Sequence, residues 1–119
     1  MISIGGRLFH GPFSLNEWTP PVESGVYAIL TGTGVMLNPE ELLYIGISRN
    51  FADGRIGPYH YAYRSWLENS DPRGNLFVAT YAMPYSSELL LALEEEKLVK
   101  LLNPVCNQLH SPIMRALFR

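Results

Sequence analysis

Three glutamates stand side by side in a leucine-rich stretch, at Glu94, Glu95 and Glu96. A carboxylate suits Mg²⁺, which binds one or two carboxylates and takes its other oxygens from water and phosphate. At helical spacing Glu95 lies four residues after Leu91 and borders the apolar face that Leu91 belongs to, whereas Glu96 pairs with Lys100 in solvent. Glu94 borders the same face, so periodicity does not choose between Glu94 and Glu95, and a solvated acidic run is the alternative.

Two tyrosines within apolar runs, Tyr27 and Tyr44, are candidates for moving a proton. A tyrosine has an ordinary pKa of about 10, so it acts as a general base only where nearby cations lower that value. Arg55 is the candidate phosphate clamp because guanidinium donates a planar fork of hydrogen bonds, and Arg49 is its nearest rival. The alternatives are packing for the tyrosines and plain surface exposure for the arginines.

Basic and aromatic residues also alternate in the central third of the chain, a pattern that can track a nucleic-acid backbone. Arg64 belongs to this set, although an amphipathic helix would give the same pattern. His60 is a candidate for contact with substrate, but a lone histidine is more often a structural or surface residue. Asn107 follows the long helix, where its amide could fix the backbone near the site or simply occupy a turn.

The helices and strands that must position these residues are predicted from runs of apolar residues and from the glycines and prolines that interrupt them. Strands are predicted at 25–30, 42–47 and 76–83, with a further short strand around 2–9. Helices are predicted at 59–68 and from Ser86 or Ser87 to Leu102, where a serine caps the start and Pro104 enforces the stop. The expected class is α+β, a small three-stranded, mostly antiparallel sheet with helices packed on it.

The tripeptides Gly25-Val26-Tyr27 and Tyr44-Ile45-Gly46 resemble the two signature tripeptides of the GIY-YIG nuclease superfamily. That superfamily includes homing endonucleases, some restriction enzymes and the incising subunit of bacterial nucleotide excision repair. Its members place an arginine about ten residues after the second tyrosine, and Arg55 lies eleven after Tyr44 (55 − 44). Two tripeptides alone are a weak signal, and the order of the blocks that follow strengthens it.

The closing motif of the family, a glutamate on a helix followed by a proline and an asparagine, is matched by Glu95, Pro104 and Asn107. The resemblance implies that Glu95 holds one Mg²⁺ or Mn²⁺ ion and that Tyr27 activates or positions the attacking water. It places Tyr44 in the same site. Tyr59 stands four residues after Arg55, where some members have histidine and others tyrosine, and His60 could serve in its place.

The resemblance spans 25–107 and implies a metal-dependent endonuclease that hydrolyses phosphodiester bonds in DNA, branched or damaged DNA included. Residues 1–24 are expected to form an N-terminal extension packed on the domain, and 108–119 a tail with a short helix from Ser111-Pro112. A catalytically silent domain of the same kind, binding nucleic acid or a partner protein, is the alternative. A second copy of the chain or a partner protein is the expected source of specificity.

Bulk composition sets the remaining limits. The chain has 119 residues, which suits one domain. Its formal net charge of −2 counts against tight non-specific DNA binding without excluding a local basic patch. The single cysteine, Cys106, excludes an intramolecular disulfide, and no apolar run reaches the roughly 20 residues that span a bilayer. The expected location is the cytoplasm.

Overall fold

The computed structural model describes residues 1–32, 42–71 and 75–108. The strands are β1 (Ile2–Ile4), β2 (Arg7–Ser14), β3 (Gly25–Gly32), β4 (Leu42–Ser48) and β5 (Asn75–Ala82). The helices are a 3₁₀ turn η2 (Phe51–Asp53) and three α-helices, α1 (Tyr63–Glu68), α2 (Glu88–Leu102) and α3 (Val105–Gln108). The predicted α+β class is confirmed, while the predicted C-terminal helix and most of the predicted 31–39 loop lie outside the described residues.

The sheet has five strands in the order β1-β2-β5-β3-β4, and every pair is antiparallel. The prediction of three strands is therefore wrong. Gly5 and Gly6 both adopt positive φ, which divides the expected strand at 2–9 into the hairpin β1–β2. The second strand of that hairpin then continues to Ser14 and pairs with β5, so the N-terminal residues supply two strands of the sheet.

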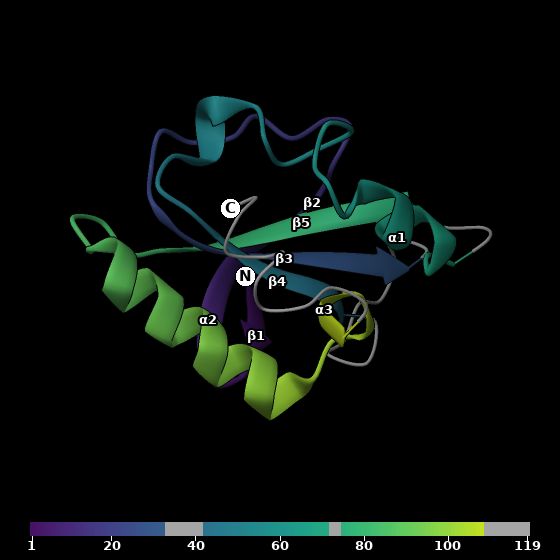
Figure 1. Ribbon diagram of the computed structural model, residues 1–119. Coiled ribbons are helices and arrows are strands. Elements are labelled where there is room, and N and C mark those ends of the chain that lie inside the picture. The colour runs from purple at the N-terminus through teal and green to yellow at the C-terminus, as the bar shows by residue number, and fades with distance from the viewer. Residues whose placement is uncertain (33–41, 72–74, 109–119) are drawn as a thin grey trace.

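The two sides of the sheet are covered differently (Figure 1). We call one side the helix face, where α2 packs on aliphatic side chains that include Val26, Ala28, Leu30, Ile45 and Ile47. We call the other side the tyrosine face, whose buried side chains include Tyr27, Ile29, Tyr44, Phe51, Trp66 and Val78. The tyrosine face is covered by α1 and by the irregular segments on either side of η2 (Figure 1).

The long helix α2 matches its prediction closely. The Ser87 hydroxyl accepts from Leu90 N–H, and Asn103 ends the helix in the left-handed conformation just before Pro104. The predicted pair of Glu96 with Lys100 forms at 2.8 Å. In the part of the chain that the structure describes, no helix combines the length and apolar character needed to cross a bilayer.

The predicted helix at 59–68 begins later, at Tyr63. The segment before it is a series of turns, in which His60 N–H donates to Gly57 C=O and Tyr63 N–H to His60 C=O. The imidazole of His60 also accepts the backbone N–H of Ala62 at 3.0 Å. A side chain that captures a nearby backbone donor competes with helix formation, and here it fixes His60 at the start of α1.

Candidate active site

The β3–β4 hairpin brings Tyr27 and Tyr44 together on the tyrosine face, with ring centroids 6.1 Å apart. Tyr27 pairs with Gly46 in the hairpin register. A Cβ atom at Gly46 would collide with the ring of Tyr27, so the phenol lies directly over the glycine. The glycine of the second tripeptide is therefore what allows the tyrosine of the first to lie flat against β4.

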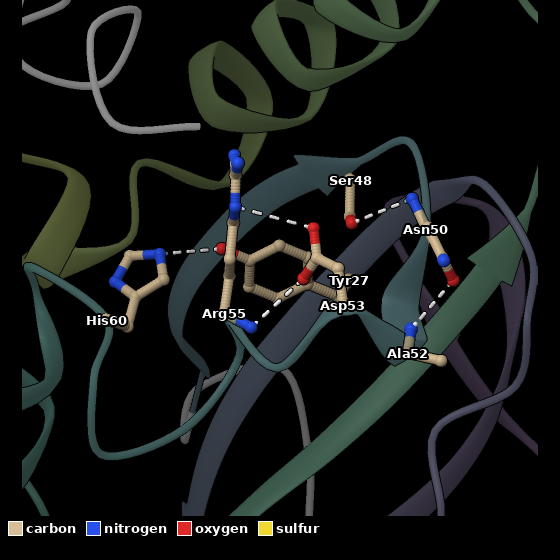
Figure 2. Close-up of polar contacts among 7 residues, drawn as sticks. All are labelled: Tyr27, Ser48, Asn50, Ala52, Asp53, Arg55 and His60. Atoms are coloured by element: carbon tan, nitrogen blue, oxygen red, sulfur yellow. Dashed lines mark hydrogen bonds and ion pairs between the residues drawn. The ribbon is translucent and has the colours of Figure 1, made fainter.

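His60 joins this pair from the segment before α1. Its Nε2 lies 2.9 Å from the hydroxyl oxygen of Tyr27 (Figure 2). Because a backbone N–H can only donate, the bond from Ala62 leaves Nδ1 without a proton, and the neutral ring carries its proton on Nε2. His60 thus donates to the oxygen of Tyr27, which favours the phenolate form of that tyrosine.

Aromatic side chains surround His60 and hold its ring in place. The ring centroid of His60 lies 4.5 Å from that of Trp66 and 4.7 Å from that of Tyr61. The hydroxyl of Tyr61 lies 3.0 Å from that of Tyr44. From the sequence, Tyr61 and Trp66 belong only to the pattern of alternating basic and aromatic residues. The direction of the Tyr61 side chain could not be derived, since the segment from Tyr59 to Ala62 has no regular period.

The structure separates the two glutamates that periodicity left open. Glu94 forms an ion pair with Arg7 of β2, with Nε and Oε1 2.9 Å apart. Glu95 is 3% exposed and lies near enough to both phenols for its charge to raise the pKa of Tyr27 and of Tyr44. Of the two, Glu95 is therefore the carboxylate whose charge reaches the tyrosine cluster, and Glu94 belongs with the hairpin β1–β2.

Burial dominates the electrostatics of the cluster. Burial raises the pKa of Tyr27 well above its ordinary value of 10.0, and the charge of Glu95 raises it further. Burial also raises the pKa of Tyr44, with Tyr27 the next cause. A positive charge at the site acts in the opposite direction and lowers a phenol pKa. The arrangement therefore supplies two protonated phenols whose acidity depends on the cations that approach them.

Arg55 and Arg49 line a pocket of about 210 Å³ between the end of β4, η2 and the first turns of α2. Arg55 Nε lies 3.5 Å from Asp53 Oδ2, and Asp53 also accepts the backbone N–H of Arg55 (Figure 2). Leu91 lines the same pocket and precedes Glu95 by one helical turn. The Asp53-Gly54 pair is a typical turn signal, and it could have identified Asp53 as the partner of Arg55.

Asn107 acts on the backbone of β4, the edge strand beside α3. Its Oδ1 accepts from Ile45 N–H at 2.8 Å and its Nδ2 donates to Ile45 C=O at 2.9 Å. Both groups belong to the residue between Tyr44 and Gly46, and an edge strand has no neighbour on that side to satisfy them. The amide thus replaces one residue of a missing strand and fixes the position of Tyr44.

Two other predicted site residues lie apart from this cluster. Tyr59 is 93% exposed, and its neighbour His60 makes the contact with Tyr27. Arg64 lies on the outer side of α1 and pairs with Glu68 at 3.4 Å. The structure therefore brings together the β3–β4 tyrosines, His60 and Glu95, with the arginine pocket next to them on α2 and Tyr59 and Arg64 outside.

Glu95 fits a single divalent ion of the kind the resemblance implies. Its buried carboxylate provides the negative charge that both phenols feel, and one carboxylate can suffice for Mg²⁺. Among residues 1–32, 42–71 and 75–108, no group of three or more His, Cys, Asp or Glu side chains is arranged around a common metal position. A single carboxylate such as Glu95 suits an ion that takes its other oxygens from water and phosphate.

Comparison of the chain with protein-family models, with curated proteins and with solved structures finds no match.

Proposed function

We propose that this chain is a DNA endonuclease of the GIY-YIG type, which hydrolyses phosphodiester bonds with one divalent ion, Mg²⁺ or Mn²⁺, at Glu95. One observation supports this above all others. Side chains that are far apart in the sequence come close together: His60 bonds to Tyr27, and the charge of Glu95, on α2, acts on the same phenol. Their types match the needs of phosphodiester hydrolysis, which are an activated water, charge neutralisation and help for the leaving oxygen.

In this proposal Tyr27, whose pKa a nearby cation would lower, first releases its own proton to solvent, and its phenolate oxygen then accepts the proton of the attacking water. The Nε2–H of His60 donates to that oxygen and stabilises the negative charge needed to accept the proton. Glu95 would hold the divalent cation, and that cation would supply neutralisation of charge on the phosphate and on the leaving oxygen. Arg55 and Arg49 hold the phosphate from the neighbouring pocket, for which Arg55 must exchange its contact with Asp53.

The remaining groups of the cluster position the reacting ones. Tyr44 packs against Tyr27 and bonds to Tyr61, and Asn107 fixes the strand that carries Tyr44. Arg64, on the exposed side of α1, is a candidate for contact with DNA beyond the cluster. We place the activity in the cytoplasm, where the buried thiol of Cys106 stays reduced, and a second copy of the chain would allow both strands to be cut.

The experiment is incubation of the protein with supercoiled plasmid and with branched DNA in Mg²⁺ or Mn²⁺, followed by gel analysis. The proposal expects nicking that disappears in chelator and in Glu95→Ala. Absence of nicking on every substrate, or nicking that Glu95→Ala leaves unchanged, would remove it.

A second candidate function is a catalytically silent domain that binds nucleic acid or a partner protein. The observation in its favour is the ion pair between Arg55 and Asp53, since a carboxylate on the guanidinium competes with a phosphate. Equilibrium binding of labelled DNA in Mg²⁺, with the same DNA recovered uncut, distinguishes this candidate from the nuclease.

A further inference from the structure

A second pocket lies beside the cluster, and none of the groups assigned so far uses it. It has a volume of about 710 Å³, which is in the range of small-molecule sites. Its walls come from β2, from β5 and from the segment between β2 and β3. The residues that line it include His10, Phe13, Glu17, Trp18, Glu23 and Thr80.

The strand register connects this pocket to Tyr27. Thr80 is the partner of Tyr27 in β5, on the side of β3 opposite Gly46, and His10 is the partner of Thr80 in β2. Neighbouring strands are about 4.8 Å apart, so the wall at Thr80 begins one strand from Tyr27 and His10 lies one strand beyond. A chain of nucleotides with a phosphate at Tyr27 can therefore place an adjacent base over Thr80.

An irregularity in β2 gives the pocket its aromatic wall. Residues three apart in a regular strand point to opposite sides, but the register shifts between His10 and Phe13. His10 then pairs with Thr80 and Phe13 with Val78, which puts both rings on the tyrosine face with centroids 5.1 Å apart. Trp18 is half-buried against the same hydrophobic cluster and supplies a further ring.

The charge of the pocket indicates which part of a nucleotide it takes. Glu17 and Glu23 line it, so a phosphate would be repelled. A base is neutral, stacks on aromatic rings, and can donate an exocyclic amino hydrogen to a carboxylate. The wall at Glu23 also contacts the tyrosine face, because the backbone carbonyl of Glu23 accepts from Phe51 N–H of η2 at 2.8 Å.

We propose that this pocket binds one unstacked nucleobase that carries an exocyclic amino group, next to the phosphodiester at Tyr27. The inference rests on the proposed nuclease function and narrows its substrate. DNA with an unpaired nucleotide at the cut, such as a bulge or a flap, fits the site, whereas fully paired DNA keeps its bases stacked and cannot fill the pocket.

The test uses the full chain in Mg²⁺ with end-labelled duplexes of one sequence, fully paired or with one unpaired A, C, G or T. We expect cuts beside the unpaired nucleotide, with kcat/KM about tenfold above that for paired DNA, and the smallest gain for thymine, which lacks the amino group. Trp18→Ala should remove this gain and leave the paired rate unchanged, while Trp18→Phe retains it.

A second variant tests the pocket independently, so that the proposal can still be overturned if Trp18→Ala does not fold. Glu17→Ala/Glu23→Ala changes two exposed side chains and should abolish the difference between thymine and the other bases. Equal cleavage of all five duplexes, or a gain that survives Trp18→Ala, overturns the pocket proposal and leaves the nuclease proposal standing.

Binding separates the two proposals if no DNA is cut. The nuclease proposal then fails, and fluorescence anisotropy of the same five duplexes tests the pocket alone. A preference for the unpaired base that Trp18→Ala removes supports the pocket. Equal affinities overturn it, as does a tryptophan emission change with spermidine but not with bulged DNA, which would mark a site for cations.

Discussion

The two faces of the sheet are built from the same strands but by different means. On the helix face, aliphatic residues of β3 and β4 pack on one regular helix, and α2 follows its predicted boundaries closely. On the tyrosine face, phenols, an imidazole and an indole are held by turns and by a 3₁₀ segment. The difference indicates that the helix face supplies stability through apolar packing. The tyrosine face instead positions buried polar groups, whose burial costs free energy unless they are hydrogen-bonded.

Of the changes considered, the largest loss of stability should come from removing the Asn107 amide, which supports the tyrosine face. Asn107→Ala leaves Ile45 N–H and C=O buried without partners, and we expect the free energy of unfolding to fall by about 2–4 kcal/mol. Urea denaturation measures the change. Gln108→Ala, on the same short helix but exposed, is the matched control and should cost less than about 1 kcal/mol. Similar losses in the two variants would contradict the assigned role of Asn107.

His60 and Tyr59 sharpen the comparison within one segment. His60→Ala removes the donor to Tyr27, and we expect the single-turnover cleavage rate to fall about a hundredfold, a typical cost of losing one donor to a catalytic negative charge. Tyr59→Ala changes an exposed side chain and should alter the rate by less than about threefold. If Tyr59→Ala proves the more damaging, the tyrosine at that position, and not His60, serves the site.

The substitution Gly46→Ala tests whether contact with β4 holds the phenol of Tyr27 in place. A Cβ atom at Gly46 collides with the ring, so Gly46→Ala should lower the free energy of unfolding by about 1–3 kcal/mol. In a Tyr27→Ala background the collision is absent, and the same change should cost almost nothing. A cost that is equal in both backgrounds, measured by a double-mutant cycle, would refute the contact.

The pH dependence of stability should differ between the faces, because the buried phenols lie on only one of them. Burial raises the pKa of Tyr27 and Tyr44, so above about pH 10 the unfolded chain loses protons that the folded chain retains. The unfolded state then binds fewer protons, and stability falls as pH rises, by about 1.4 kcal/mol per pH unit for each phenol. Below that range this contribution is fully present.

Cys106 adds to the same loss, since burial raises the pKa of its thiol to about 11. Urea denaturation across this alkaline range measures the slope. The double variant Tyr27→Phe/Tyr44→Phe should flatten it, whereas Tyr85→Phe, an exposed control, should leave it unchanged. A slope that the double variant does not change would show that the two phenols are not the groups retaining protons.

The sequence predicted the regular parts of the molecule and most of the cluster. The β3–β4 hairpin and α2 follow from apolar runs and a serine cap, and the family spacing chose Glu95 over Glu94. One strand was predicted around 2–9 where two form, because Gly5-Gly6 makes a hairpin turn within it. Tyr61 was not assigned to the cluster because the segment before α1 is irregular, and no period connects sequence position with side-chain direction there. Trp66 lies on α1, where the sequence does not distinguish it from an ordinary core residue.

The matched pair Glu95→Gln and Glu94→Gln tests the central claim most directly. Both changes keep the size of a side chain on α2, but only Glu95 belongs to the tyrosine cluster, while Glu94 pairs with Arg7. The account predicts that Glu95→Gln lowers the single-turnover rate on branched DNA in Mg²⁺ about a thousandfold, and that Glu94→Gln stays within about threefold of the unmodified chain. Equal rates for the two variants, or full activity in Glu95→Gln, would contradict it.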